Sequence, residues 1–300
     1  MATAAEPRPA TLPLPGGSAD ATVVLHPLLT ARLAAPPGLM RRDSGRLAGL
    51  KLLGVGVGRE RYVDMPVTAF LVEHPMAGNV LIDTGFHGSV AIEPARAMGR
   101  LGGLIYRDVR MQSEDAAPAQ LRALGIAPEQ VGTVVMTHLH SDHASGIAHF
   151  PDATFVVSAA EWKAAVSGGE REGYVRRQFD HGFDYRLVDF DGPGTVSFAS
   201  FGHALDLFGD GSVTLVSTPG HTEGHLSVVL RLGGREALIA GDAIYTLESL
   251  RDGHPPYRMA DEHFYQRSLR EIGLYVEQTP GALVIPSHDI ELWESLASVY

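Results

Sequence analysis

Five short apolar runs lie along the chain, and a histidine or an aspartate follows each of them within five positions. The runs are residues 80–82, 134–136, 213–216, 237–240 and 283–285. Runs this short, rich in β-branched residues and bounded by glycine or proline, are typical of buried strands. In layered α/β folds, functional side chains gather at the carboxyl ends of strands. The histidines and aspartates after these runs are therefore the first candidates for a functional site.

Helical periodicity appears between the predicted strands. Leu121 and Leu124 share one helical face, with Asp115 as the expected N-cap and Gly125 as the expected stop. A second helix, ended by Pro280-Gly281, is predicted from apolar residues at i, i+4, i+7 and i+11, namely Tyr265, Leu269, Ile272 and Val276. Hairpin turns are predicted at residues 76–79 and 233–234.

Two long segments interrupt this pattern. Residues 86–117 match no regular strand and are expected to form a helical or loop insertion, and residues 168–210 are expected to form a second excursion. No convincing linker divides the chain. We therefore expect a flexible N-terminal arm, residues 1–22, followed by one α/β domain, residues 23–300. The arm could instead pack on a partner subunit, which leaves a homodimer open.

Composition narrows the class of protein. Hydrophobic residues make up 45% of the 300 residues and charged residues 20%, as in an ordinary globular chain. Asp plus Glu number 35 against 24 Lys plus Arg, and the resulting net charge of −11 argues against a nucleic-acid-binding surface. The chain has no cysteine, which excludes disulfides, thiolate metal sites and a cysteine nucleophile.

Neither a membrane span nor a secretory signal is predicted. No window approaches the roughly 18 consecutive apolar residues that a spanning helix needs. The first twenty residues are rich in proline, alanine and glycine, and they lack the basic start and the apolar stretch of a signal peptide. We therefore expect a cytoplasmic protein with no membrane partner.

The string HLHSDH, residues 138–143, places three imidazoles and one carboxylate within six positions. Directly after a strand, His138 and His140 can turn toward one point, while Asp142 and His143 face a neighbouring point. Imidazole nitrogen and carboxylate oxygen suit zinc, and also manganese, iron or cobalt. A loop that is rich in histidine by chance is the alternative. The chain has only 14 histidines, so three of them within six positions favour a metal site.

Three more candidate ligands follow later strands. His221 lies in the segment TPGHTEGH, Asp242 follows Gly241, and His288 follows Pro286-Ser287. A lone histidine after a strand is more often an ordinary loop residue. Together, however, these residues complete two sites of three protein ligands each, plus a bridging carboxylate.

The HxHxDH string, the later PGH, the GD and the terminal SH together resemble the metallo-β-lactamase superfamily over roughly residues 49–290. The resemblance implies an α/β fold, a four-layer αβ/βα sandwich with a dinuclear site at one edge of its sheets. It implies two divalent metal ions, with zinc as the expected ion. The implied ligands are His138, His140 and His221 for the first metal, Asp142, His143 and His288 for the second, and Asp242 as the bridge between them.

Two further residues have a predicted supporting role. Asp83 matches the early aspartate of the family, which supports the ligand histidines without binding the metal itself. The alternative interpretation is that Asp83 simply forms a turn. His225 lies beyond the ligand pattern and is expected to be structural or supporting.

The superfamily hosts many reactions, so other residues must select one. The absence of cysteine separates this chain from the commonest zinc β-lactamases. His140 separates it from redox diiron relatives, which have a glutamate there. Tyr245, three positions after Asp242, resembles the tyrosine of N-acyl-homoserine lactonases. A buried aromatic residue at a helix start is the alternative interpretation of Tyr245.

The resemblance thus implies a dinuclear metallo-hydrolase that opens the ring of N-acyl-homoserine lactones, which is the quorum-quenching reaction. A metal-bridging hydroxide would attack the carbonyl, Tyr245 would share the developing charge, and Asp142 would pass a proton to the departing alcohol. A broad-specificity esterase, thioesterase or phosphotriesterase is the alternative enzyme. A non-catalytic metal- or signal-binding protein and an iron dioxygenase are further alternatives. For either hydrolase, the partner is a small lactone or ester.

An acyl tail would need an apolar groove. The 86–117 segment offers apolar residues that could line such a groove or could belong to the core, namely Met98, Leu101, Leu104, Ile105, Tyr106 and Met111.

Overall fold

The computed structural model describes residues 4–42, 45, 48–52, 54–97 and 108–300. One sheet contains the strands β1 (Arg8–Pro9), β2 (Val24–Ala35), β3 (Val63–His74), β4 (Gly78–Ile82), β5 (Val109–Arg110), β6 (Val131–Val135), β7 (Thr154–Ser158) and β8 (Asp184–Val188). The other contains β9 (Val196–Phe198), β10 (Phe201–Asp206), β11 (Val213–Ser217), β12 (Leu226–Arg231), β13 (Glu236–Gly241) and β14 (Leu283–Pro286). The helices are α1 (Pro37–Met40), α2 (Ala48–Leu52), α3 (Pro94–Ala97), α5 (Ala117–Ala123), α6 (Ser141–Ala144), α7 (Ala159–Ser167), α8 (Leu247–Asp252), α9 (Glu262–Gln278) and α10 (Ile290–Ser295).

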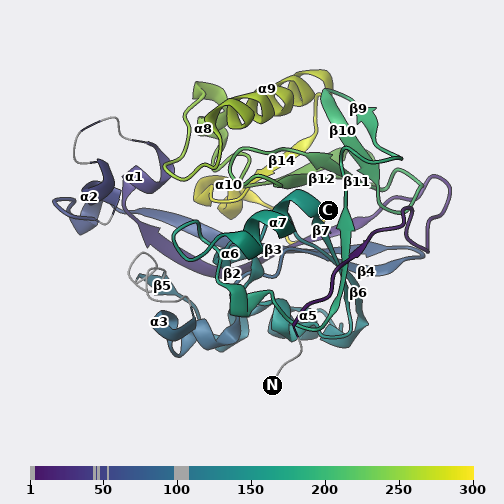
Figure 1. The fold of residues 1–300 in the computed structure, drawn as a ribbon, viewed down its shortest axis with the longest axis horizontal. Helices are drawn as coiled ribbons and strands as arrows, with labels where there is room; N and C mark the ends of the chain where they lie inside the picture. Colours follow the sequence, from purple (N-terminus) through teal and green to yellow (C-terminus); the bar gives the residue numbers. More distant parts are fainter. Residues whose placement is uncertain (1–3, 43–44, 46–47, 53, 98–107) are drawn as a thin grey trace.

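The two sheets stack between outer helices, as Figure 1 shows, with α9 above the six-stranded sheet and α5 below the eight-stranded sheet. Alternation along the strands creates these layers, because successive side chains of a strand point to opposite faces. Val80 and Ile82 of β4 pack in the core between the sheets, whereas Leu81 packs in the outer core with α5 and α7. On the other sheet, Val229 faces α9. The predicted four-layer α/β sandwich is confirmed.

Strand direction explains where the loops lie. In the order β1-β8-β7-β6-β4-β3-β2-β5, the neighbours from β1 to β4 are parallel, so β4, β6 and β7 end at the same edge. In the order β14-β13-β12-β11-β10-β9, β13 and β14 are parallel and two antiparallel pairings separate β11 from β13. The strands β11, β13 and β14 therefore run in one direction, and the loops that follow them share an edge.

The five predicted strands and both predicted hairpin turns are confirmed, but the two predicted excursions need correction. Residues 168–210 contain β8, β9 and β10. These strands lack the continuous apolar runs by which the other strands are predicted, because polar residues stand between their apolar ones, as in DYRLV of β8. Within residues 86–117, the described part is helical or irregular except for β5, a two-residue strand that pairs with β2. Residues 98–107 lie outside the described residues.

The helix predictions are correct in place but wrong in detail. Ala116, not Asp115, is the N-cap of α5, because Asp115 closes the preceding 3-10 turn by accepting a hydrogen bond from the Gln112 amide. Leu124 is 46% exposed, so only Leu121 of the predicted pair is buried.

The predicted face of α9 is wrong at its last position. Val276 is 37% exposed, and the buried residue there is its neighbour Tyr275. The Tyr275 ring lies 5.6 Å from that of Phe201, and its hydroxyl donates to Glu236. The helix ends at Gln278, before the predicted Pro280-Gly281 stop.

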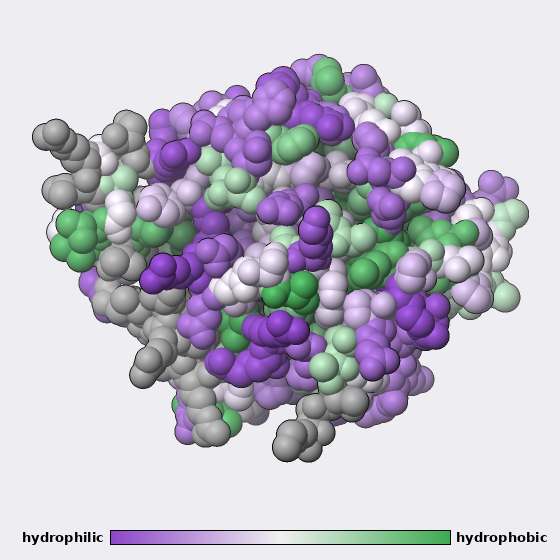
Figure 2. All heavy atoms as spheres, viewed as in Figure 1, coloured by the Kyte–Doolittle hydropathy of each residue, from purple (hydrophilic) through white to green (hydrophobic). Residues whose placement is uncertain are grey.

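Part of the N-terminal segment lies along the domain. Arg8 and Pro9 pair with β8, and Leu12 and Leu14 pack against the core between the sheets. Figure 2 shows hydrophilic residues over most of one face, with hydrophobic residues in separate groups. Among the described residues, no helix is long and apolar enough to cross a membrane.

Candidate metal centre

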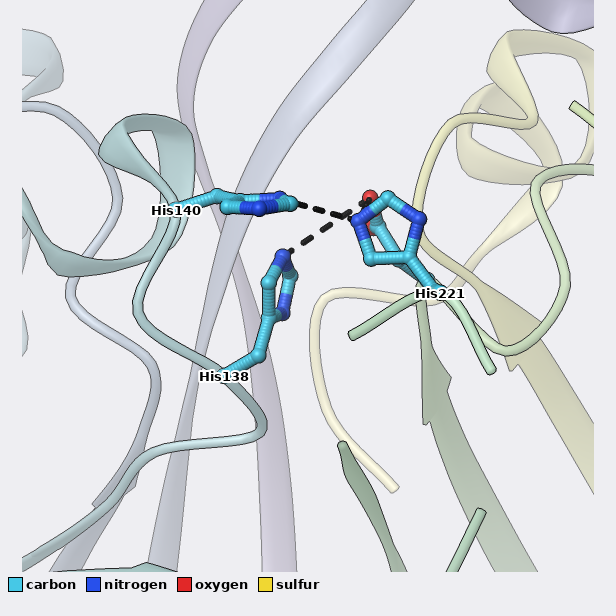
Figure 3. A group of neighbouring side chains, drawn as sticks. His138, His140 and His221 are labelled. Atoms are coloured by element: carbon cyan, nitrogen blue, oxygen red, sulfur yellow. Dashed lines mark hydrogen bonds and ion pairs between the residues drawn. The ribbon is translucent and has the colours of Figure 1, made fainter. Parts of the chain in front are cut away.

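Seven candidate ligands converge where the two sheets bring their loops together. His138 and His140 follow β6, and Asp142 and His143 lie in α6. From the other sheet, His221 follows β11, Asp242 follows β13 and His288 follows β14, and all seven side chains are buried. In Figure 3, His138 and His140 rise from one loop toward His221, which approaches from the other sheet.

A first group contains His138, His140, His221 and Asp242, whose ligand atoms all lie within 4.8 Å of one another. His221 Nε2 lies 2.9 Å from His140 Nδ1 and 3.1 Å from Asp242 Oδ2. His138 Nε2 lies 3.9 Å from the same carboxylate oxygen. Three imidazoles and a carboxylate thus face one point, as in a site for a single ion.

A second group contains Asp142, His143 and His288. Asp142 Oδ2 lies 3.9 Å from His143 Nε2 and 3.6 Å from His288 Nε2. The same two imidazole nitrogens lie 3.1 Å and 3.4 Å from Asp242 Oδ1. The second group therefore also borders Asp242.

Asp242 is the residue that the two groups share. Its Oδ2 faces the first group and its Oδ1 faces the second. Burial acts to raise the pKa of this carboxyl, but His288, His221 and His143 together hold it well below its ordinary value. An ionised carboxylate between two clusters of imidazoles has the chemistry of a bridging metal ligand.

The unpartnered atoms of the site test whether metal ions fit it. Buried polar atoms normally have a hydrogen-bond partner. Here the Nε2 atoms of His138 and His143 and the Oδ1 atom of Asp242 are buried without one. These are nitrogen and oxygen lone-pair atoms that suit zinc and similar divalent ions. The donor set therefore fits metal ions.

Comparison with known proteins identifies the family. The model of the metallo-beta-lactamase superfamily matches residues 62–288. This chain belongs to the metallo-β-lactamase superfamily. The N-acyl homoserine lactonase AttM of Azorhizobium caulinodans is 35% identical over 241 residues, which cover 77% of this chain and 85% of that protein. The superfamily fold and the two His/Asp groups fit two divalent metal ions.

Solved structures show the same fold. An N-acyl homoserine lactone hydrolase with N-hexanoyl-L-homoserine bound at its catalytic metal centre has a TM-score of 0.73 and 22% identity, and the match covers 92% of this chain and 97% of that chain. AidC, described as a dizinc quorum-quenching lactonase, has a TM-score of 0.60 and 15% identity, with 92% and 90% of the two chains covered.

In three of the candidate ligand histidines, the ring nitrogen Nδ1 lies within hydrogen-bond distance of an oxygen atom. His143 Nδ1 lies 2.7 Å from Asp83 Oδ2. His221 Nδ1 lies 3.2 Å from the Arg258 carbonyl oxygen, and His288 Nδ1 lies 3.1 Å from that of Pro66. An oxygen at Nδ1 holds the proton there and leaves the Nε2 lone pair free to face a metal ion.

Asp83 and His225, the two predicted supporting residues, both contact the site. Asp83 accepts hydrogen bonds from the amide and the hydroxyl of Thr137, the residue before His138, in addition to its contact with His143. His225 Nε2 accepts a hydrogen bond of 2.9 Å from the Asp242 amide, so this nitrogen is already used. The last position of β13, Gly241, needs a glycine, because a Cβ there would lie 2.7 Å from His225 Nε2 and φ is +54°.

Charge divides the two groups. In the first, burial lowers the pKa of all three histidines, and that of His221 falls to about 4. In the second, burial acts in the same direction, but nearby carboxylates outweigh it. Asp83, Asp242 and Asp142 raise the pKa of His143 well above its ordinary value, and Asp242 raises that of His288. The histidines of the first group are thus held in their neutral form, whereas those of the second lie beside carboxylates that favour their charged form.

Tyr245 lies inside the centre and also precedes a helix. Its side chain is 4% exposed, and its ring centroid lies 5.7 Å from that of His221 and 4.8 Å from that of His288. Its carbonyl oxygen accepts a hydrogen bond from the His288 amide. The next residue, Thr246, is the N-cap of α8. Tyr245 is thus a buried aromatic residue at a helix start, and its catalytic role stays a prediction.

Glu161 is a buried residue of the site that the sequence did not single out. Its Oε1 accepts hydrogen bonds from the Leu139 amide at 2.9 Å and the Tyr174 hydroxyl at 3.2 Å, and its Oε2 accepts one from the Thr222 hydroxyl at 2.6 Å. Glu161 thus joins the loop of His138 and His140 to that of His221. Burial raises its pKa to about 7. An acidic residue in the first turn of a helix is too common a pattern to have indicated this role.

Proposed function

We propose that this chain hydrolyses the ring ester of N-acyl homoserine lactones with two divalent ions, zinc in the first instance. The observation that carries the proposal is a complete set of seven ligand candidates around a shared Asp242, in a chain 35% identical to an N-acyl homoserine lactonase. A structural neighbour described as a dizinc lactonase supports zinc. Cytoplasmic location and a homodimer stay predictions.

In this proposal, His138, His140 and His221 hold the first ion, Asp142, His143 and His288 hold the second, and Asp242 binds both. When bound, the two ions supply a Lewis acid for the carbonyl oxygen and lower the pKa of water toward about 7. Each histidine offers Nε2 or Nδ1 as a neutral donor.

Two residues would act on the substrate itself. The Tyr245 ring lies beside one histidine of each group, and its phenol would donate a hydrogen bond to the oxygen that becomes negative as the lactone carbonyl is attacked. Asp142 would take up the proton that the attacking water gives up and pass it to the alcohol oxygen of the opening ring, because an alkoxide is a poor leaving group in a buried site. No covalent intermediate with the protein is needed.

A cavity of about 510 Å³ supplies a route for the substrate. It is lined by His140 and His221 of the first group and by Tyr174 and Tyr257. The seven ligand residues are each at most 5% exposed, so the site excludes most bulk water. Of the apolar residues predicted as an acyl groove or as core, Met111 is partly buried and packs against a core cluster, and the other five lie outside the described residues.

Proton release tests the reaction. Zinc-loaded protein is mixed with N-hexanoyl homoserine lactone in weak buffer, because ring opening creates a carboxylic acid that ionises at neutral pH. We expect fast acidification that stops when a chelator is added. A protein that holds two ions but releases no protons would contradict the proposal. An aryl ester and a phosphotriester, tested in parallel, would then identify the alternative hydrolase, and binding without turnover would identify a signal-binding protein.

A further inference from the structure

A buried guanidinium nitrogen without a partner lies beside the first group. Nη1 of Arg258 has no hydrogen-bond partner among the described residues, and no described carboxylate forms an ion pair with this side chain. Leaving a buried charged donor unsatisfied is costly, because it has lost its water without gaining an acceptor. Such a group is a candidate for binding a ligand that supplies the missing acceptor.

Gly173 shows how close Arg258 lies to a metal-ligand candidate. A Cβ at Gly173 would lie 2.6 Å from Arg258 Nη1 and 2.6 Å from His140 Cδ2, so both side chains pack against the same backbone point. The φ of +102° at this position also favours glycine. The positive charge of Arg258 accordingly contributes to the lowered pKa values of His140 and His221.

The backbone around Arg258 is fixed to the His221 loop. The Arg258 carbonyl oxygen lies 3.2 Å from His221 Nδ1, and the Ala260 amide donates to the His221 carbonyl oxygen at 3.0 Å. The guanidinium is therefore held in place before any substrate arrives. Such preorganisation reduces the entropy lost when a ligand binds.

The cavity of about 510 Å³ opens beside this guanidinium. It is lined by Arg258, by the imidazoles of His140 and His221, and by Tyr174, Tyr257 and Met259. Two acidic residues, Glu172 and Glu223, also line the cavity, but neither forms an ion pair with Arg258 among the described residues. Glu172 accepts a hydrogen bond from the Gly169 amide.

We infer that Arg258 binds the carbonyl oxygen of the N-acyl amide and so selects lactones that carry an acylamino group. This inference rests on the proposed function. A guanidinium can only donate hydrogen bonds. In an N-acyl homoserine lactone, the ring carbonyl and the ring oxygen react at the metal centre and the amide nitrogen is a donor. The amide carbonyl is the acceptor that remains, and it lies a few bonds from the reacting carbon.

The test compares two substrates in Arg258→Met and in a matched variant, Arg251→Met, which removes an exposed arginine of α8. The substrates are N-hexanoyl homoserine lactone and an α-alkyl-γ-butyrolactone without an amide. A charge-assisted hydrogen bond corresponds to about 10- to 100-fold. We expect Arg258→Met to lose that factor in kcat/KM on the acylamino lactone, mainly through KM, and less than about twofold on the alkyl lactone. Arg251→Met should change neither rate.

Equal losses on both substrates, or no loss on either, would overturn the inference. Metal content and thermal unfolding show whether each variant is intact, and Arg258→Lys, which keeps the charge without the planar fork, should give an intermediate KM if Arg258→Met does not fold.

Calorimetric binding of N-hexanoyl homoserine, which needs no turnover, separates the proposed hydrolysis from the proposed role of Arg258. If the wild-type protein binds this compound about 10- to 100-fold more tightly than Arg258→Met but opens no lactone, the proposed hydrolysis is contradicted and the proposed binding of the amide carbonyl by Arg258 is supported. Equal affinity, or no binding, overturns the subsite.

Discussion

The two sheets contribute to the metal centre in different ways. The eight-stranded sheet supplies four ligand candidates from one short segment, residues 138–143. The six-stranded sheet supplies three from separate strand ends, at His221, Asp242 and His288. The first set is close together because its members are neighbours in sequence. The second set is close together only because β11, β13 and β14 run in the same direction in one sheet.

The residues that orient the ligands differ as well. On the eight-stranded side, carboxylates do this: Asp83 contacts His143, and Glu161 accepts a hydrogen bond from the amide of Leu139, which lies between His138 and His140. On the six-stranded side, backbone carbonyl oxygens contact the outer nitrogens of His221 and His288. A substitution cannot remove a backbone carbonyl. Single substitutions in the supporting residues should therefore disturb the first side more than the second.

Asp242 is where the two sides meet, so its removal should have the largest effect. Asp242→Ala takes away the oxygens that face both groups. Loss of an outer partner of a metal ligand already costs about 10- to 100-fold, so we expect more than about 100-fold loss of lactonase activity. Metal content, measured after dialysis, should fall below two ions per chain. The control is Asp252→Ala at the end of α8, which should keep both ions. Retention of two ions by Asp242→Ala would show that the groups are independent.

Tyr245→Phe removes a hydroxyl from the six-stranded side and leaves every ligand candidate in place. Loss of one donor to a developing oxyanion costs about 100-fold or more in kcat. Both metal ions should remain, because the ring packing against His221 and His288 is preserved. Steady-state kinetics and metal analysis of the same preparation check both parts. An unchanged kcat would assign Tyr245 to packing alone.

Asp83→Asn tests the carboxylate support of the eight-stranded side. The NH2 group that replaces Asp83 Oδ2 cannot accept the hydrogen bonds of His143 Nδ1 and the Thr137 hydroxyl. It would favour the other His143 tautomer, in which Nε2 carries the proton and no longer offers a lone pair. We expect metal affinity or activity to fall by about 10- to 100-fold, measured by competition with a chelator.

His225→Leu is the matching change on the six-stranded side. It leaves the buried Asp242 amide without its acceptor, which should lower the free energy of unfolding by about 1–3 kcal/mol in urea denaturation. Metal affinity should change less than in Asp83→Asn. A larger loss of metal affinity in His225→Leu would reverse the comparison between the two sides.

The same contrast explains what the sequence could predict. The HxHxDH string is local, so its residues indicated a metal site directly. His221, Asp242 and His288 were weak candidates one by one, and only the combined motif joined them. Glu161 and Arg258 lie at contacts between segments far apart in sequence, and no local pattern marks such contacts. The strands in 168–210 were missed because their polar positions break the apolar runs.

Glu161 offers a pH test of the link between the two loops, and this test measures stability and not ligand identity. Burial raises the pKa of Glu161 from an ordinary 4.5 to about 7 in the folded chain. Between these values the folded chain binds more protons than the unfolded chain, so the free energy of unfolding falls as pH rises through this window. The contribution is fully present below the lower value and lost above the higher one.

Glu161→Gln removes this titration while keeping the size of the side chain. Wild type and variant are unfolded by urea at several pH values from 4.5 to 7.5 with equal metal loading, so that the titration of the metal ligands cancels in the difference. We expect wild type to lose stability relative to the variant as pH rises from about 4.5 to about 7. Parallel curves would mean that the carboxylate is ionised throughout. Its hydrogen bonds to Leu139, Tyr174 and Thr222 would then outweigh its burial, and the link between the two loops would be a fixed charge.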